Sequence, residues 1–277
     1  MITGTTRLIA HIGFPTETFK SPQIYNPWFA RMGIDAVVVP MGSKPDHFPQ
    51  FFKQVFGLTN IAGALITMPH KATVMNLVDR LSAQAAIAGA CNAVKRDADG
   101  QLVGDMFDGE GFVRGVRRKG RDIQGARALV VGSGGVGSAI AASLAQAGVA
   151  ELALFDSNVA NQNALAARLR QHFPALTVKQ GERDPDGFDL VVNATPLGMK
   201  QNDPLPMDAS RIASTAFVGE VVMKTKITPF LAAARERGCS FMVGADMLFE
   251  QIPAYLEVFG FPAATAEELR ATATIAY

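Results

Sequence analysis

The stretch ARALVVGSGGVGSAIAASLAQAGVAELALFD, residues 126–156, decides the fold of this chain. Residues 128–131 form a short apolar run with the length and β-branched content of a buried strand. A G-x-G-x-x-G pattern, an alanine-rich helix over residues 138–147 and a second strand over residues 151–155 follow it, and Asp156 closes the unit. Strand, glycine turn, helix, strand and acid in this order predict a Rossmann-like dinucleotide-binding fold.

The glycine turn is expected to hold a pyrophosphate. Main-chain N–H groups at the positive end of a helix bind phosphate, and glycine permits a close approach because no side chain intervenes. An acid about 20 residues further on can bind the ribose hydroxyls. The alternative is a tight strand-to-helix turn that binds no ligand. The candidate cofactor residues of this stretch are Gly132, Ser133, Gly134, Gly135, Val136, Gly137 and Asp156.

Length and composition describe a globular protein. The 277 residues suffice for one large domain or two modest ones, with 48% apolar and 18% charged residues. A net charge of +1 argues against a general attraction to nucleic acid or to an anionic membrane. Cys91 and Cys239 form no spacing motif, which suits a reducing cytosol. We find no signal peptide and no apolar run of about 18 residues, so we expect a cytoplasmic protein.

Strands alternate with helices on both sides of the nucleotide unit, which predicts an α/β architecture with mostly parallel strands. Before the unit we expect strands over 7–12, 35–40 and 63–68, helices over 22–32, 46–56 and 108–120, one amphipathic helix over 72–88, and a hairpin of 90–95 with 101–104. After it we expect helices over 158–172 and 229–236, strands over 177–179, 188–194, 217–223 and 240–243, and helical structure from 247 to 277. Residues 1–107 should therefore form a separate α/β layer, and a ligand should bind between the two parts.

Few residues can be identified as catalytic or ligand-binding candidates from their local sequence alone. Lys71 follows a predicted strand directly and is held by a proline turn, although an isolated lysine is more often a surface charge. Asn92 and residues 104–109 give the same kind of signal, and the alternative is a turn stabilised by an Asn or Asp side chain. His70 alone is more typical of a turn than of a catalytic base. No cluster has metal-ligand spacing and no G-x-S-x-G elbow is present, so neither a metal site nor a serine hydrolase is supported.

Seven short motifs occur in one order along nearly the whole chain. They are K-S-P at 20–22, T-M-P-H-K at 67–71, N-A-V at 92–94, D-G at 108–109, G-S-G-G-V-G at 132–137, N-A-T-P-L-G-M at 193–199 and G-A-D-M-L-F-E-Q at 244–251. Together they resemble the shikimate dehydrogenase family, which includes quinate dehydrogenases. The resemblance implies a substrate domain of residues 1–107 plus 245–277, with the C-terminal helices packing back on it, and a Rossmann-like NAD(P)-binding domain of residues 108–244. It also implies a reversible hydride transfer between a nicotinamide cofactor and a ring alcohol, as in aromatic amino acid biosynthesis.

The same resemblance assigns roles to single residues. Lys71 and Asp108 match the family's catalytic pair, which suits the reaction because the substrate oxygen gains negative charge and must take up a proton. The residues implied to bind substrate are Ser21, Thr67, Asn92 and Gln251. The resemblance also implies that Val221 and Gly244 offer main-chain carbonyls to the nicotinamide, and that Asn193 and Thr195 line its ribose side.

Five positions that are commonly polar in the family are apolar in this chain. They are Phe19, Leu65, Met106, Phe107 and Met223. Each lost hydrogen bond to a charged group costs about 1.5–3 kcal/mol. We therefore expect shikimate to be a poor or secondary substrate and the true ligand to be less polar or differently oriented.

The predicted ribose loop also departs from the family. Members that use NADP carry arginines after the second strand, and this chain has Asp156-Ser157-Asn158 with Asn161 further on. A 2′-phosphate needs cationic donors, whereas Asp156 would repel it and accept the free ribose hydroxyls. NAD should thus be preferred over NADP, and NADP use stays possible if Arg183 or Lys179 reaches the site from another loop.

Other functions stay open at this point. A regulatory paralogue that keeps the cofactor but lacks turnover would explain the lost polar residues, and a quinate dehydrogenase is a variant within the class. The expected partner is a small cyclic hydroxy acid or polyol rather than nucleic acid or a membrane, and the protein could be a monomer or a homodimer.

Overall fold

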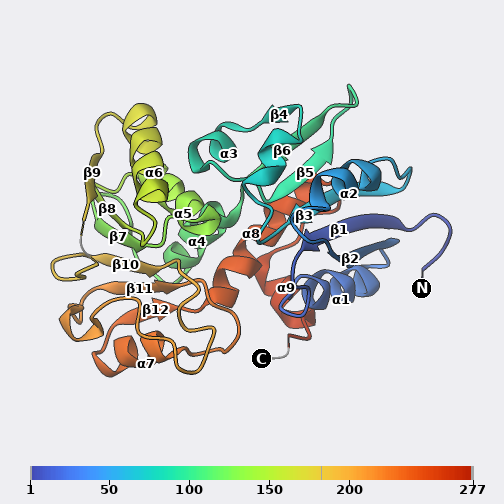
Figure 1. Cartoon of the computed structure of the whole chain (residues 1–277). Helices are drawn as coiled ribbons and strands as arrows, with labels where there is room; N and C mark the ends of the chain where they lie inside the picture. The colour runs from blue at the N-terminus through green and yellow to red at the C-terminus, as the bar shows by residue number, and fades with distance from the viewer. Residues whose placement is uncertain (1, 182, 276–277) are drawn as a thin grey trace. The chain divides into compact units, whose positions relative to one another are not determined.

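The computed structural model describes residues 2–181 and 183–275 and places them in two compact units (Figure 1). Unit 1 comprises residues 2–86, 90–107 and 252–275, and unit 2 comprises Ile87–Gly89 and Asp108–Gln251. Each unit contains a six-stranded sheet with helices packed on it, so the predicted α/β fold class is confirmed. Residues 245–251 cluster with unit 2, whereas the sequence places the return to the first domain at residue 245.

The sheet of unit 1 has the strand order β2-β1-β3-β5-β6-β4. Its strands are β1 (Arg7–Gly13), β2 (Ala36–Gly42), β3 (Ile61–Ile66), β4 (Arg80–Leu81), β5 (Ala93–Arg96) and β6 (Leu102–Asp105). Strands β2, β1 and β3 run parallel, and β5 pairs antiparallel with β3 and β6. The helices of this part of the chain are α1 (Pro22–Met32), α2 (Phe48–Val55), α3 (Ala83–Ala88) and α9 (Ala266–Thr272). The carboxyl ends of β1 and β3 consequently lie at one edge of the sheet.

The single amphipathic helix predicted over residues 72–88 is wrong. The chain forms a 3-10 turn η1 (Thr73–Asn76), then β4, then α3. The N–H of Asp79 donates to the carbonyl of Leu102 and the N–H of Ser82 to that of Gly104, both at 2.9 Å. The Ser82 hydroxyl then accepts a main-chain N–H from the first turn of α3. Asp79 and Ser82 are polar residues between apolar residues that have helical spacing. Because their main-chain N–H groups bond to β6, no continuous helix forms.

The sheet of unit 2 is entirely parallel, with the strand order β12-β11-β10-β7-β8-β9. Its strands are β7 (Arg127–Val131), β8 (Glu151–Phe155), β9 (Thr177–Gln180), β10 (Leu190–Asn193), β11 (Phe217–Glu220) and β12 (Ser240–Met242). Its helices are α4 (Asp108–Arg118), α5 (Gly135–Gln146), α6 (Val159–His172) and α7 (Pro229–Glu236), with a 3-10 turn η2 (Ala209–Arg211). The strand order reverses between β7 and β10, and ligands of such sheets bind at the carboxyl ends of the strands at this switch point.

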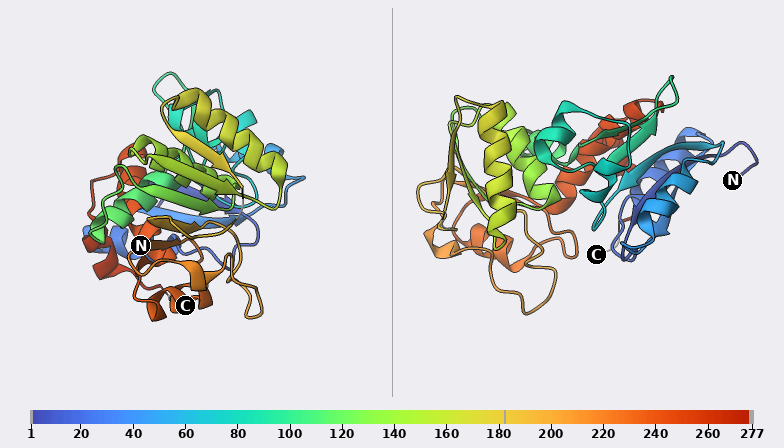
Figure 2. Two further views of the ribbon diagram at one scale, coloured as in Figure 1. Left: turned by 90° about the vertical axis from the view of Figure 1, so that its left-hand side faces the viewer. Right: turned by 45° about the horizontal axis from the view of Figure 1, so that its top comes forward.

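Two apolar clusters cover the two faces of the sheet in unit 2. The helices that contribute to them can be followed in the ribbon views of Figure 2. One contains Phe112 of α4 and Ile140 of α5 together with Leu165 of α6. The other contains Phe230 and Leu231 of α7. Strands buried on both faces are continuous apolar runs, which is why β7, β8 and β10 were recognised from sequence.

The segment after residue 251 completes unit 1. The helix α8 (Gly244–Val258) begins in unit 2, and its residues from Ile252 onward cluster with unit 1, where α9 packs on α1. Arg7 at the start of β1 donates a 2.8 Å hydrogen bond to the carbonyl of Phe259 and lies over the ring of Phe261. The Phe259 ring fills the space beside Gly63 of β3, where a Cβ would lie 2.4 Å from it. The C-terminal residues therefore pack back on the first unit, as the fold class predicts.

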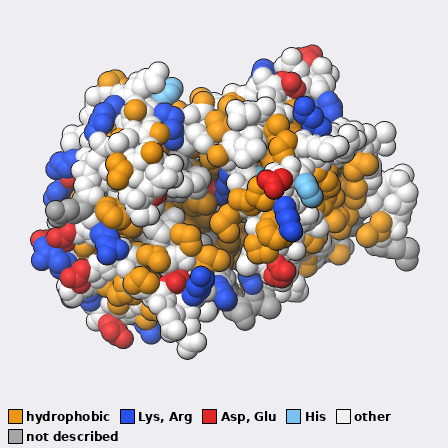
Figure 3. Space-filling model, viewed as in Figure 1, with side chains coloured by type: hydrophobic (Ala, Val, Ile, Leu, Met, Phe, Trp, Pro, Cys, Tyr) orange, Lys and Arg blue, Asp and Glu red, His pale blue; other side chains and the backbone are white. Residues whose placement is uncertain are grey.

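The surface carries charges of both signs. On the face in Figure 3, lysine and arginine side chains are interspersed with aspartate and glutamate, in line with the net charge of +1. No helix within residues 2–181 and 183–275 is long and apolar enough to cross a membrane.

Candidate dinucleotide and substrate sites

The glycine turn follows β7 and begins α5. Gly132 has φ +108°, and a Cβ there would lie 2.7 Å from the main chain of Ala194, in the loop after β10. A Cβ on Gly137 would lie 1.9 Å from the carbonyl oxygen of Gly132. By contrast, Gly134 is exposed and a Cβ there would meet nothing within 4 Å. The outer glycines are thus required by packing, whereas Gly134 leaves the positive end of α5 open to a ligand.

Asp156 is hydrogen-bonded to the glycine turn. Its Oδ2 accepts the N–H of Ser133, and its Oδ1 accepts the N–H of Asn158 at 2.7 Å. Its own N–H donates to Oε1 of Gln162 at 3.0 Å. The predicted ribose acid therefore lies next to the glycine turn, as the strand–turn–strand spacing requires, and it also fixes the loop between β8 and α6.

Lys179 and Arg183 are the two cations considered as partners of a 2′-phosphate, and they lie at different places in unit 2. Lys179 pairs with Glu151 at the start of β8, with 2.7 Å between Nζ and Oε2, and so lies at the opposite end of the strand from Asp156. The guanidinium of Arg183 lies 5.9 Å from the ring centre of Phe155, the residue before Asp156. Of these two cations, Arg183 is therefore the one that lies near the ribose loop.

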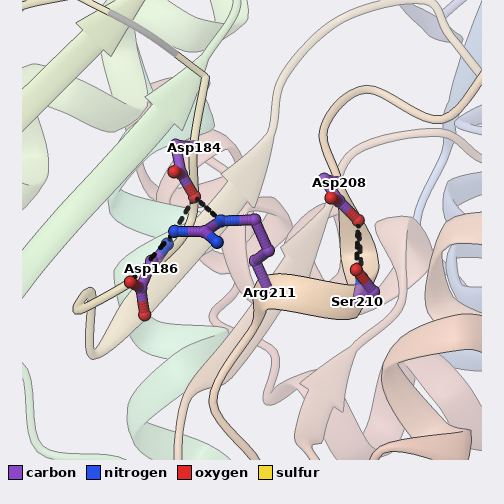
Figure 4. Close-up of polar contacts among 5 residues, drawn as sticks. All are labelled: Asp184, Asp186, Asp208, Ser210 and Arg211. Atoms are coloured by element: carbon purple, nitrogen blue, oxygen red, sulfur yellow. Dashed lines mark hydrogen bonds and ion pairs between the residues drawn. The ribbon is translucent and has the colours of Figure 1, made fainter.

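The loop after Arg183 is held in place by an ion pair (Figure 4). Nε of Arg211 donates to Oδ1 of Asp184 at 2.8 Å, and Nη2 donates to Oδ2 of Asp186 at 3.1 Å. Asp208 accepts a hydrogen bond from the side chain of Ser210 and caps η2, the turn that carries Arg211.

The loops after β10 and β11 meet at two buried polar residues. Asn193 is fully buried, and its Nδ2 donates to the carbonyl of Leu197 and to Oε1 of Glu220. Its Oδ1 accepts the N–H and the hydroxyl of Thr195, at 3.0 and 2.6 Å. Both ends of this carboxamide are used within the protein, and the Thr195 hydroxyl also accepts the N–H of Leu197 at 3.1 Å. Asn193 and Thr195 together therefore shape this loop.

Glu220 was not found from sequence. It follows three apolar or small residues of a buried strand, and an acid at a strand end was the available signal. Burial is the main cause that raises its pKa to about 7, although every hydrogen bond it accepts acts to lower that pKa.

Val221 and Gly244, the residues predicted to offer carbonyls to the nicotinamide, lie against one another. A Cβ on Gly244 would lie 2.4 Å from the carbonyl oxygen of Val222 and 2.9 Å from that of Val221. The contacts therefore continue across the carboxyl edge of the sheet from Asp156 to Gly244, which is the extended site that a dinucleotide needs.

Within unit 1, hydrogen bonds tie the predicted lysine to the strand hairpin. The carbonyl of Lys71 accepts the N–H of Cys91 at 2.8 Å. Next to it, Asn92 bridges β3 and β6, because its carbonyl accepts the N–H of Ile66 and its N–H donates to Asp105. Lys71 is partly exposed, so its side chain keeps access to solvent.

Three predicted site residues carry a buried polar atom with no hydrogen-bond partner among the described residues. These atoms are Nδ2 of Asn92, Oε1 of Gln251 and Oγ of Ser133. A buried group without a partner is costly, and a bound ligand is one way to satisfy it. The residues present therefore fit a polar substrate and a phosphate group.

Phe19 replaces a hydroxyl with an aromatic ring beside the predicted substrate residues. Its ring stacks on His11 at 4.0 Å between centroids. A Cβ on Gly13 would lie 2.4 Å from the Thr67 methyl and 2.9 Å from the Phe19 ring. The Phe19 ring and the Thr67 side chain therefore lie close together, both next to Gly13. Ser21 is buried at the start of α1, and its hydroxyl makes no helix-capping hydrogen bond.

The histidines near Lys71 are structural. Burial, with a smaller effect of the Lys71 charge, lowers the pKa of His11 to about 3, so the ring is neutral. His70 donates from Nε2 to the carbonyl of Ser43 at 2.7 Å and stacks on Phe48. The sequence expectation that His70 belongs to a turn agrees with these contacts. The described residues contain no group of three or more His, Cys, Asp and Glu side chains placed to hold a metal ion.

Of the other apolar replacements, Leu65, Met106 and Phe107 are buried, and Met223 is partly exposed. Phe107 packs edge-on against Tyr255. Phe19 and Met223 are accordingly the replacements that keep exposed area at the carboxyl edges of the two sheets.

Comparison with known proteins agrees with this picture. The family model for the shikimate dehydrogenase substrate binding domain matches residues 12–94, and the ThiF family model matches residues 112–172. A shikimate dehydrogenase (NADP(+)) from Rhodospirillum rubrum is 34% identical, over 98% of both chains. Shikimate 5-dehydrogenase from Listeria monocytogenes, solved with shikimate and NAD, has a TM-score of 0.88 at 27% identity and covers 98% of this chain and 97% of its own. Quinate dehydrogenase from Corynebacterium glutamicum, solved with NAD, has a TM-score of 0.86 at 27% identity and covers 96% of this chain and 98% of its own.

The parallel sheet, the glycine turn and the acid at the end of the next strand define a Rossmann-like dinucleotide-binding protein. The chain belongs to the shikimate dehydrogenase family. It is an NAD(P)-dependent dehydrogenase of that type, as the resemblance implies.

Proposed function

We propose that this enzyme oxidises a ring hydroxyl of a small cyclic hydroxy acid, and reduces the corresponding ketone, with unit 1 binding the substrate and unit 2 the cofactor. Shikimate and quinate, which are bound or acted on by the similar proteins, define the substrate class. The observation that carries the proposal is the continuous edge of unit 2 from Asp156 through the glycine turn to Gly244.

Two residues carry the proton chemistry in this proposal. The nicotinamide, when bound, supplies or accepts the hydride. The ammonium of Lys71 stabilises the negative charge that develops on the substrate oxygen and donates a proton to it. The carboxylate of Asp108 accepts a hydrogen bond from the substrate hydroxyl.

Hydrogen bonds within unit 1 support a shared role for these residues. Oδ1 of Asn92 accepts the N–H of Phe107 at 3.0 Å, and Phe107 precedes Asp108. The neighbouring Cys91 holds the main chain of Lys71. The carboxamide of Asn92 thus has Nδ2 left for a substrate hydroxyl, and we propose the same use for Oε1 of Gln251.

The substrate scope should differ from that of a dedicated shikimate dehydrogenase. The Phe19 ring, which lies beside Thr67, offers no donor to a carboxylate. Ser21 and Thr67 remain as hydroxyl donors, so we propose a substrate with an apolar or smaller group where shikimate has its carboxylate.

NAD is the proposed preferred cofactor. The Asp156 carboxylate disfavours a 2′-phosphate, and its oxygens can accept ribose hydroxyls in addition to the main-chain N–H groups. Arg183 beside Phe155 is the group that would allow weaker use of NADP.

Substitution of the lysine tests the proposal. Lys71→Met should lower kcat by about 10²-fold or more, the usual size of a general acid's contribution, while the affinity for NADH, measured by fluorescence titration, stays unchanged. Lys53→Met on the exposed face of α2 is the matched control and should change neither. If the unaltered protein binds NADH but oxidises no member of a panel of cyclic hydroxy acids and polyols, the regulatory alternative, which the apolar replacements favour, is correct.

A further inference from the structure

Glu220 is a wholly buried carboxylate at the end of β11. Its Oε1 accepts the N–H groups of Val221 and Val222 at 3.1 and 3.2 Å and Nδ2 of Asn193 at 2.9 Å. Its Oε2 accepts the hydroxyl of Thr228 at 2.9 Å. Four donors surround this group, and none of these donors among the described residues is a basic side chain. Its oxygens therefore act as acceptors for the polypeptide itself.

The donors come from the two loops that end the central strands of unit 2. Asn193 is also hydrogen-bonded to Thr195 and Leu197 in the loop after β10. Thr228 caps α7, which follows the loop after β11. Glu220 therefore joins the loops after two neighbouring strands, β10 and β11, on one side of the switch point.

Glu220 also fixes the main chain that Gly244 contacts. Its Oε1 accepts the N–H of Val222, which belongs to the same peptide unit as the Val221 carbonyl, so Glu220 sets the orientation of that carbonyl. The Val221 carbonyl lies so close to Gly244 that a Cβ there would be 2.9 Å from its oxygen. A change at Glu220 would therefore act directly on the Val221 carbonyl.

We infer that Glu220 is the positioning residue for the nicotinamide half of the cofactor site, because it sets the loop that carries Thr195 and the carbonyl of Val221. The inference rests on the proposed use of these two residues toward the nicotinamide. Within the part of the chain that the structure describes, no hydrogen bond joins Glu220 to the glycine turn or to Asp156, at the adenosine half.

Binding of two ligands, NADH and ADP-ribose, distinguishes the nicotinamide half of the cofactor site from the rest. ADP-ribose contains every part of NADH except the nicotinamide, so binding of both is measured by calorimetry on the full chain. Glu220→Met, which keeps the side-chain volume but cannot accept a hydrogen bond, should weaken NADH about tenfold and leave ADP-ribose within about twofold. Glu220→Gln keeps an amide oxygen for the three donors at Oε1 and should restore NADH affinity. Glu151→Gln, at the amino end of β8 in the same sheet, is the matched control and should alter neither ligand.

The inference is overturned if Glu220→Met binds NADH like the unaltered protein, or if NADH and ADP-ribose weaken in parallel, because the second result means a structural role alone. Should Glu220→Met not fold, Glu220→Asp decides in the same way, since it keeps the charge and withdraws the oxygens by one methylene. Failure of the unaltered protein to bind NADH or NADPH would instead refute the proposed function and is visible before any substitution is made.

Discussion

The N–H of Phe107 donates a 3.0 Å hydrogen bond to the side-chain oxygen of Asn92, so one carboxamide fixes the chain immediately before Asp108. The same carboxamide has a buried N–H group with no partner among the described residues. Asn92 thus combines a bond that holds the fold with a donor that is left for a substrate.

Replacing Asn92 should affect stability and activity together. Asn92→Ala leaves the buried N–H of Phe107 unpaired, which should lower the free energy of unfolding by about 1–3 kcal/mol in urea titrations. It should also lower kcat/KM by about tenfold or more, because a donor to the substrate is lost. Asn26→Ala is the matched control, since Asn26 exchanges two hydrogen bonds with the main chain of Val38 in the same unit. The control should lose stability alone, and an equal loss of activity in both variants would contradict the role of Asn92.

Substitution of Phe19 tests the substrate scope. Phe19→Ser restores a hydroxyl beside Thr67 and should raise kcat/KM for shikimate by about tenfold, the equivalent of one hydrogen bond to a charged group. Steady-state kinetics with shikimate and quinate, at saturating cofactor, give the comparison. Unchanged kinetics with shikimate would mean that Phe19 does not limit the substrate scope.

Cofactor preference should depend on Arg183. Arg183→Gln removes the cation beside the ribose loop and should raise KM for NADP about fivefold to tenfold, while KM for NAD changes less than about twofold. Arg170→Gln on α6, whose guanidinium donates to the carbonyl of Val178, is the matched control. A KM for NADP below that for NAD in the unaltered protein would refute the proposed preference itself.

A substitution at Gly134 should weaken cofactor binding without affecting folding. Because a Cβ there meets nothing within 4 Å, Gly134→Ala should change the free energy of unfolding by no more than about 0.5 kcal/mol. The added methyl group stands where a phosphate must approach the start of α5, so the affinity for NADH should fall about tenfold or more. Gly4→Ala, equally uncrowded but in unit 1, should change neither quantity. Normal NADH binding by Gly134→Ala would place the pyrophosphate elsewhere.

The stability of the protein should depend on the titration of Glu220. Its pKa is raised from 4.5 to about 7 in the folded state, so the folded protein holds the proton more tightly than the unfolded chain does. The stabilisation is complete below the unfolded pKa and is lost as the pH rises through about 7. Relative to Glu220→Gln, which does not titrate, the unaltered protein should lose about 3 kcal/mol of unfolding free energy between pH 4.5 and pH 8. Urea titrations across this range measure the difference, and parallel pH profiles for the two proteins would refute the shift.

The elements predicted best from sequence are those whose ends are marked by local chemistry. Pro22 at the start of α1 and Gly33 after its end, with φ +66°, gave the helix its true bounds. Pro229 after the Thr228 cap did the same for α7. By contrast, residues 72–88 carry helical apolar spacing, and their real structure depends on hydrogen bonds to β6, which is far away in sequence.

In the candidate site too, local sequence predicts some residues, whereas others depend on contacts that are distant in sequence. The glycine turn and Asp156 follow from the spacing of one strand–turn–helix–strand unit. Glu220 escaped notice because its meaning comes from Asn193 and Thr228, which reach it only in the folded sheet. Asn193 was assigned to the cofactor by motif, and its saturated hydrogen bonds became visible only in three dimensions.

The contact between Phe259 and Gly63 has a consequence for biosynthesis. The strands of unit 1 are synthesised before residues 108–251, yet the aromatic side chain that fills the space beside β3 is synthesised after them. Residues 108–251 can therefore fold while unit 1 still exposes an unfilled apolar face. Unit 1 completes its packing only when Phe259 has been made.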